Sequence, residues 1–189
     1  MPANTSNYRG RFAPSPTGPL HLGSLIAALA SYLDARHHGG EWLVRMEDLD
    51  PPRAEPGAAA AILEGLEKHG LDWDGTVLWQ GERDSAYNEA LDRLSREGKL
   101  FDCICTRAEL GPDGVCAGRC AQQPRGDNAA RALRLRVPPG TVIQFVDRLQ
   151  GRQAMDLDAA LPDFTLRRKD GLYAYQLAVV VDDAAQGIT

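Results

Sequence analysis

The chain is organised around one stretch, Arg11-Phe12-Ala13-Pro14-Ser15-Pro16-Thr17-Gly18-Pro19-Leu20-His21-Leu22-Gly23-Ser24. Its first three residues close a short strand, and the two X-Pro steps that follow hold the backbone extended. Gly23 and Ser24 then open an amphipathic helix. This order aims helix N–H groups and the positive end of the helix dipole at the turn, so the stretch predicts a site for an anion such as a phosphate.

The next residues predict a repeated order of strands and helices. Apolar residues from Leu25 to Leu33 recur at helical spacing, Trp42 to Met46 is typical of a buried strand, and a second helical pattern runs from Pro56 to Gly70. Strands and helices that alternate in this way are typical of a parallel α/β sheet, whose ligands lie at the carboxyl ends of the strands. The Arg11 loop and the turn that begins at Glu47 both follow such ends.

Beyond a third helical pattern, which starts near Tyr87 and ends at Gly98, the sequence changes character. Short β-like runs separated by Pro-Gly and Asp-Gly turns predict an inserted, strand-rich subdomain. The stretch from Tyr173 to Asp183 fits a strand or a helix, and we prefer a helix. We expect residues 1–99 to form the first half of an α/β core, 100–172 the insertion, and 173–189 the truncated start of the second half. The expected strands of the insertion are Leu133 to Val137, Val142 to Asp147 and Phe164 to Arg168.

Composition narrows the classes of protein. The 189 residues are 43% hydrophobic, which is enough for one substantial core. A balance of 21 Lys+Arg against 26 Asp+Glu gives a net charge of -5, so any RNA contact has to come from local basic patches. The sequence has neither an apolar run of about 18 residues nor a signal-peptide pattern, and we expect a cytoplasmic monomer with no membrane partner.

Four cysteines form two close pairs on a glycine-rich segment. Cys103 and Cys105 are followed, after ten residues, by Cys116 and Cys120. Four thiolates at such spacing suit tetrahedral Zn²⁺, and a closed site of this kind is structural because it leaves no open position for catalysis. Two disulfides are the alternative, which a reducing compartment disfavours.

The loop motif resembles the first signature of the class I aminoacyl-tRNA synthetases. That signature usually reads His-x-Gly-His, and here it is His21-Leu22-Gly23-Ser24, with serine in the place of the second histidine. Together with this motif, the runs Arg11 to Pro16 and Arg45 to Asp48 narrow the resemblance to the glutamyl branch.

Within that branch, the segments Gly23 to Leu29 and Asp48 to Arg53 and the cysteine cluster resemble the glutamyl-queuosine tRNA(Asp) synthetases, a family of truncated paralogues. The resemblance implies a Rossmann-type parallel sheet with an inserted zinc-binding subdomain. It also implies a glutamate-specific ligase. ATP, supplied with Mg²⁺, activates L-glutamate to glutamyl-adenylate, and the glutamyl group passes to the queuosine base in the anticodon of tRNA(Asp).

The resemblance assigns the ATP side of the site. His21, Gly23 and Ser24 are expected to be the catalytic signature residues, and Thr17, His21 and Gly23 to bind ATP. Adenylate formation needs positioned donors more than a nucleophile, because charge develops on the α-phosphate. His21 can donate to the phosphates, and Gly23 lets the backbone approach the nucleotide.

The glutamate side follows in the same way. Two carboxylates and an ammonium require a fork-shaped cation and an anion, and these roles are carried over to Arg11 and Glu47. Ala13, Ser15 and Tyr175 are the further expected contacts. Alternatively, Arg11 and Glu47 pair with each other across adjacent strands and Tyr175 is a core aromatic.

Two metal assignments also depend on the resemblance. The third zinc position of the family is commonly a tyrosine, so Cys116 is a departure that makes the site softer and tighter if it aligns there. The carboxylates of Asp48 and Asp50 follow a strand and are expected to be solvated rather than to bind Mg²⁺.

No Lys-x-Ser-Lys sequence, the second class I signature, occurs in the 189 residues. The family's later glutamate-binding arginine is also missing. Because one such donor contributes about 10² to 10³ in rate, we expect this fragment by itself to be inactive. Two other interpretations stay open: a fragment of a glutamyl-tRNA synthetase that charges tRNA(Glu), and a noncatalytic zinc module that binds RNA or protein.

Overall fold

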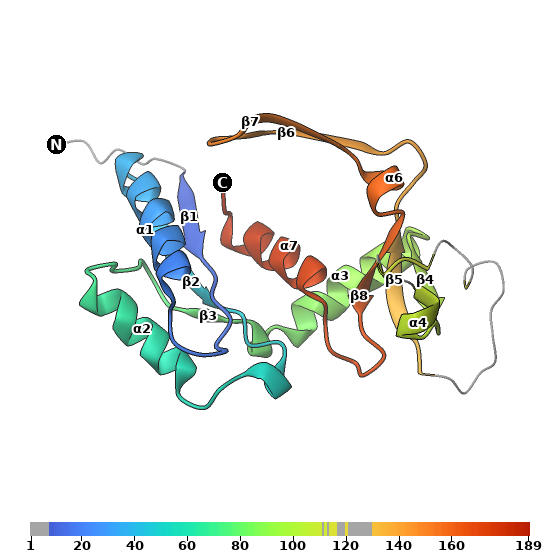
Figure 1. Ribbon diagram of the computed structural model, residues 1–189, viewed down its shortest axis with the longest axis horizontal. Helices are drawn as coiled ribbons and strands as arrows, with labels where there is room; N and C mark the ends of the chain where they lie inside the picture. Colours follow the sequence, from blue (N-terminus) through green and yellow to red (C-terminus); the bar gives the residue numbers. More distant parts are fainter. Residues whose placement is uncertain (1–7, 111, 113, 117–119, 121–129) are drawn as a thin grey trace. The chain divides into compact units, whose positions relative to one another are not determined.

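The computed structural model describes residues 8–110, 112, 114–116, 120 and 130–189 (Figure 1). This part of the chain forms two compact units. The first runs to Ala86 and resumes from Val179 to Thr189, and the second runs from Tyr87 to Ala178. The changeovers fall inside two helices, whereas the parts expected from the sequence meet at residues 99–100 and 172–173.

The first unit contains the expected parallel sheet, with strand order β1-β2-β3. Each neighbouring pair of strands is parallel, and helices α1 and α2 make the crossovers. The α/β class is therefore confirmed for this unit. The elements are β1 (Arg9–Phe12), α1 (Leu22–His37), β2 (Glu41–Met46), α2 (Ala58–Lys68) and β3 (Leu78–Trp79), with 3₁₀ turns at Pro51–Arg53 and Gln80–Glu82.

The two faces of strand β2 differ in chemistry. Successive side chains of a strand point to opposite faces. Trp42, Val44 and Met46 lie in the apolar core, whereas Arg45, which is also fully buried, lies on the opposite face. The other members of the core are Phe12, Ala28, Ala35, Ile62, Leu66 and Leu71.

The second unit is strand-rich, as expected for the insertion. It holds a three-stranded antiparallel sheet of order β4-β5-β8 and an antiparallel hairpin, β6-β7. The predicted strands are found within one residue of their expected bounds, whereas β4 and β7 were not predicted. The strands are β4 (Leu100–Cys103), β5 (Ala132–Arg136), β6 (Val142–Asp147), β7 (Gly151–Asp156) and β8 (Asp163–Arg167).

The remaining helices are α3 (Asp84–Arg96), α4 (Arg107–Leu110), α6 (Leu157–Ala160) and α7 (Tyr175–Gln186). Helix α7 confirms the preferred interpretation of an ambiguous stretch. After it, the N–H of Thr189 donates to the carbonyl oxygen of Arg9 at 3.1 Å, so the chain returns to β1. None of the helices in the described ranges combines the length and the apolar composition that crossing a membrane requires.

The entry into β2 depends on a close approach of two backbones. The N–H of Glu41 donates to the carbonyl oxygen of Tyr8 at 3.1 Å, which starts the pairing of β1 with β2. A Cβ at Gly40 would overlap this same carbonyl oxygen and lie 2.9 Å from the Cβ of Tyr8. Only glycine therefore fits at position 40 without moving the first strand.

Substitution of this glycine tests the constraint. We expect Gly40→Ala to lower the free energy of unfolding by about 1–3 kcal/mol, because the added methyl group overpacks the strand pair. The matched control is Gly65→Ala in α2, where the nearest atom to a new Cβ is 3.8 Å away. The control should gain about 1 kcal/mol from helix propensity. Urea unfolding of both variants measures the difference, and equal effects would contradict the close approach.

Candidate active site and cysteine centre

The loop after β1 is fixed by hydrogen bonds to two neighbouring turns. The carbonyl oxygen of Pro14 accepts from the N–H of Glu47, and that of Pro16 accepts from the N–H of Glu55, both at 2.9 Å. The prolines lack N–H groups but keep their carbonyl acceptors, so they can join the loop to the end of β2 without closing it into a helix. The loop therefore lies at the carboxyl ends of the strands, as predicted.

A hollow of about 520 Å³ lies between this loop and the start of α1. Its volume is in the range of pockets that hold small-molecule ligands. Six residues that the sequence predicted for the site line it: Ala13, Ser15, Thr17, His21, Gly23 and Ser24. The tertiary structure thus brings together all the residues expected on the ATP side.

His21 caps helix α1. Its backbone is extended, and its Nδ1 accepts from the N–H of Ser24 at 3.2 Å. Because Nδ1 is an acceptor here, the proton of the neutral ring resides on Nε2, which lies 3.1 Å from the hydroxyl of Ser24 and donates to it. The helix was expected to open at Gly23 and Ser24, but it begins one residue earlier because the imidazole supplies the cap. One N–H group expected to face an anion is therefore engaged by the ring.

Gly23 makes this cap possible. A Cβ at position 23 would lie 3.1 Å from Cε1 and 3.2 Å from Nδ1 of His21. These separations are tighter than ordinary van der Waals contact, so a larger residue would push the ring away from the helix. The contact with His21 therefore explains why position 23 is a glycine, in addition to the expected approach of a nucleotide.

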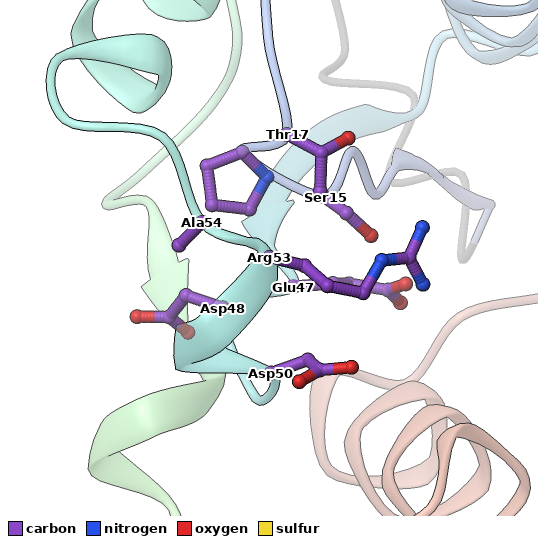
Figure 2. A pocket seen from close by; sticks show the side chains of 8 residues that line it. Ser15, Thr17, Glu47, Asp48, Asp50, Arg53 and Ala54 are labelled. Atoms are coloured by element: carbon purple, nitrogen blue, oxygen red, sulfur yellow. The ribbon is translucent and has the colours of Figure 1, made fainter.

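A second, smaller hollow of about 40 Å³ adjoins the same loop (Figure 2). Ser15 and Thr17 line both hollows. Figure 2 shows the carboxylate of Glu47 and the guanidinium of Arg53 on one side, and the carboxylate of Asp48 turned away from them. The remaining lining residues are Pro16, Asp50 and Ala54.

Asp48 is used structurally. Its Oδ1 accepts from the N–H of Gly81 at 2.7 Å, which connects the turn after β2 to the turn after β3. This hydrogen bond gives the carboxylate a role that requires no Mg²⁺. Arg53, in contrast, brings a cation to the smaller hollow that the sequence had not singled out.

The two charged residues expected to bind glutamate, Arg11 and Glu47, lie in a cluster of charges. Arg11 forms an ion pair with Asp183 of α7, at 3.1 Å from Nε to Oδ1. Glu47 forms one with the buried Arg45, at 3.3 Å from NH2 to Oε1. Arg45 also contacts Asp183, so one chain of charges joins β1, β2, the turn after β2 and α7.

The two carboxylates of this cluster differ in acidity. Burial raises the pKa of Glu47 above its ordinary value, and the charges of Arg45 and Arg11 only partly offset the effect. Burial also opposes the ionisation of Asp183, but hydrogen bonds from Arg11 and Arg45 outweigh it and lower the pKa of that carboxyl group. Asp183 therefore keeps its negative charge to a lower pH than an ordinary aspartate does, whereas the negative charge of Glu47 is incompletely compensated.

Tyr175 begins helix α7, and 59% of it is exposed. Such exposure excludes the alternative that it is a core aromatic. Its expected contact to glutamate stays a prediction.

The four cysteines gather in the second unit. All are buried and free, and their sulfur atoms lie within 4.8 Å of one another. The sulfur of Cys105 is 3.7 Å from that of Cys116 and 3.4 Å from that of Cys120. Four sulfurs placed about 2.3 Å from a central Zn²⁺ at tetrahedral angles are separated by about 3.8 Å, so the donor set and its spacing fit this metal. The separations are too long for the S–S bonds of the alternative interpretation.

The thiols of the cluster differ in acidity. Burial raises the pKa of Cys103, and it raises the pKa of Cys105 to about 11. Burial also opposes the ionisation of Cys120, but hydrogen bonds from the Ile104 backbone and the neighbouring thiols lower its pKa to about 7. The cluster is therefore ready to supply its first thiolate near neutral pH.

A buried ion pair holds the segment that carries Cys116. Asp163, which begins β8, accepts from the N–H of Cys116 at 3.0 Å and from Nε of Arg134 at 2.6 Å. The guanidinium of Arg134 also donates to the carbonyl oxygen of Gly114 and to the hydroxyl of Thr165. The side chains of this arginine and this aspartate are 2% and 3% exposed. The pair therefore connects the cysteine loop to the sheet through desolvated hydrogen bonds.

Sequence reasoning missed Arg45, Asp183 and the Arg134–Asp163 pair. One signal was present, because Arg45 interrupts an otherwise apolar strand and a charge in a buried strand needs a partner. Glu47 is only two residues from Arg45, but Asp183 lies far from both of its arginines in the sequence, as Asp163 does from Arg134, so these distant partners carried no local signal.

Variants of His21 test its role as a cap. His21→Ala should lower the free energy of unfolding by about 1 kcal/mol, because the N–H of Ser24 loses its acceptor. His21→Asn should retain most of the stability, because asparagine is among the best capping residues. Thermal or urea unfolding compares the two, and equal stability of the alanine variant and the parent protein would argue against the cap.

Asp163→Asn tests the support of the cysteine loop. Removing the charge from a buried pair leaves Arg134 uncompensated, and we expect a loss of about 3 kcal/mol or more. Metal analysis of reduced, freshly purified protein should also show less zinc in the variant than in the parent. Asp102→Asn is the control, because Asp102 pairs with Arg131 on an exposed surface. Its effect should stay within about 0.5 kcal/mol, and an equally small effect at Asp163 would refute the proposed support.

Several known proteins are similar to this chain in sequence. Glutamyl-Q tRNA(Asp) synthetase of Dechloromonas aromatica is 58% identical over 97% of this chain and 64% of its own length. The proteins of the same name from Xanthomonas campestris pv. campestris and Pseudomonas fluorescens are 60% and 56% identical, over 60% and 63% of their lengths. The chain thus spans less than two thirds of each of these relatives.

Solved structures and a family profile extend the comparison. The crystal structure of a glutamate tRNA ligase from Elizabethkingia meningosepticum, in complex with its amino acid, matches 97% of this chain and 43% of that one, with a TM-score of 0.81 and 28% identity. A TM-score of this size supports the Rossmann-type synthetase fold that the sequence resemblance implied. The family profile of the class I tRNA synthetases (E and Q), catalytic domain, matches residues 7–127. The chain belongs to this family of class I tRNA synthetase catalytic domains.

Proposed function

We propose that the protein activates L-glutamate with ATP to form glutamyl-adenylate, and that it transfers the glutamyl group to the queuosine base of tRNA(Asp). The observation that carries the first part is the position of the 520 Å³ hollow, lined by the signature residues, at the loop that also borders Glu47. A nucleotide and a dicarboxylic amino acid require these two environments side by side.

In the first step, a carboxylate oxygen of glutamate attacks the α-phosphorus of ATP, and the bond to pyrophosphate breaks. The phosphate oxygens gain charge as this happens, so donors at the start of α1 stabilise the transition state. The hydroxyl of Ser24 accepts from Nε2 of His21, which leaves its own proton to donate to a phosphate oxygen. Mg²⁺ would accompany ATP as part of the substrate.

Glutamate is proposed to bind on the other side of the loop. Arg11 supplies a planar cation for a carboxylate, and Glu47 supplies an anion for the ammonium. The raised pKa of Glu47 supports this role, because an incoming ammonium compensates the charge that burial disfavours. Ala13, Ser15 and Tyr175 are proposed as further contacts.

The tRNA assignment is supported by the names of the longer relatives. Charging of tRNA(Glu) is the second candidate, because a glutamate tRNA ligase shares the fold at 28% identity. The four cysteines are proposed to hold one structural Zn²⁺, which would fix the turns of the second unit.

The ATP–pyrophosphate exchange reaction tests activation. The complete gene product should catalyse exchange that depends on L-glutamate, and it should transfer labelled glutamate to tRNA(Asp) that contains queuosine. Transfer to tRNA(Glu) instead would favour the second candidate, and an absence of exchange would reject the enzyme. Residues 1–189 by themselves are proposed to exchange at least about 10²-fold more slowly, because they contain no Lys-x-Ser-Lys donor loop.

The pH dependence of this exchange isolates Glu47. Its pKa is raised, so its carboxylate takes up a proton at a higher pH than an ordinary glutamate does. The protonated form cannot pair with an ammonium, and the KM for glutamate should therefore increase as the pH falls through the raised pKa. In Glu47→Gln, the KM should be high and insensitive to pH over this range. Glu41→Gln, at the start of β2, alters an exposed pair with Arg9 and should leave the profile unchanged.

A further inference from the structure

Asp183 lies at the point where two arginines from adjacent strands meet. Its Oδ1 and Oδ2 accept from Nε and NH2 of Arg11 at 3.1 and 3.2 Å. The same Oδ1 accepts from NH1 of Arg45 at 2.6 Å. One carboxylate on α7 therefore engages Arg11 through a two-point fork and Arg45 through a short, charge-assisted hydrogen bond.

The register of the sheet explains why both arginines reach one carboxylate. In the parallel pairing of β1 and β2, Arg11 stands opposite Leu43. Arg45 follows Leu43 by two residues, and residues two apart on a strand share a face. Arg11 and Arg45 thus project from the same face of the sheet, which is opposite to the apolar core. The C-terminal part of α7 meets this face.

The two-point contact fixes the plane of the Arg11 guanidinium. A single hydrogen bond would let the planar group turn about its long side chain, whereas a fork holds both position and plane. Arg45 cannot move aside, because its side chain is fully buried and is also bound by Glu47 and by Oε1 of Gln186. Asp183 therefore connects the partly exposed guanidinium of Arg11 to the fully buried one of Arg45.

We propose that Asp183 is a positioning residue that holds the guanidinium of Arg11 in the orientation needed to bind a carboxylate of the amino-acid substrate. This inference rests on the proposed function, because it assigns the control of substrate affinity to a residue that acts through Arg11. Asp183 need not touch the substrate. Its loss would lower the affinity for glutamate and leave the ATP side, at the start of α1, unchanged.

Exchange kinetics of the complete gene product test the inference. Asp183→Asn should raise the KM for glutamate by about 10-fold to 100-fold, as expected for a misplaced binding group, while the KM for ATP stays within twofold of the parent value. Asp182→Asn is the matched control. Asp182 is the neighbouring residue on the same helix, fully buried, and it binds Gln80 and Arg83. This control is expected to lose stability without any change in the KM for glutamate.

A double-mutant cycle with Arg11→Lys separates positioning from general stability. If Asp183 acts through Arg11, the double variant should bind glutamate no more weakly than Arg11→Lys alone, because the lysine has no fork to orient. Fully additive effects on the KM would overturn the inference. If Asp183→Asn does not fold, Asp183→Glu keeps the charge and shifts the carboxylate, and an unchanged KM for glutamate in that variant would also overturn it.

The parent protein provides the remaining control. Without glutamate-dependent exchange by the parent, the proposed function fails and the inference falls with it. Normal exchange by the parent together with an unchanged KM in the Asp183 variants rejects the inference alone.

Discussion

The fully buried guanidinium of Arg45 is the constraint on which the geometry of the first unit depends. A buried charge costs several kcal/mol unless anions and hydrogen bonds compensate it. Its anions come from the turn after the same strand, at Glu47, and from a helix far along the chain, at Asp183. If either anion moved away while Arg45 stayed buried, the charge of the guanidinium would lose compensation, so the strand, the turn and the helix are held together. The residues proposed to bind glutamate, Arg11 and Glu47, are therefore held in place through their contacts with Asp183 and Arg45.

The two faces of the sheet differ in the kind of side chains that they carry. On one face, Trp42, Val44 and Met46 pack into an apolar core that needs no ligand. On the other face, charges are held close together, and the raised pKa of Glu47 shows that the compensation is incomplete. Charges packed in this way make this face less stable than an apolar one would be. The signature loop lies at the edge that both faces share.

A second buried ion pair fixes part of the second unit. There a buried arginine, Arg134, and an aspartate at the start of a strand, Asp163, hold the loop that carries Cys116. A small unit with a short sheet has little apolar area to fix such a loop. An arginine fork can satisfy several backbone carbonyls and a carboxylate at once, so a single side chain orders the segment before any metal binds. This explains how Cys116 can be held next to the other cysteines of the cluster.

The sequence by itself predicted the class of fold, the order of most elements and six of the residues that line the hollow beside the loop. Proline steps, helical periodicity and an apolar strand are local signals that predicted the parallel α/β sheet and the loop, and the spacing of the cysteines predicted their cluster. The start of α1 did not follow from the motif, because the side chain of His21 caps this helix one residue earlier than the motif indicated. Only the tertiary structure decided the partners of the charges. Arg11 pairs with Asp183, and Arg134 pairs with Asp163. Neither pairing could be predicted from the local sequence, because ion pairs depend on distance in space and not on separation along the chain.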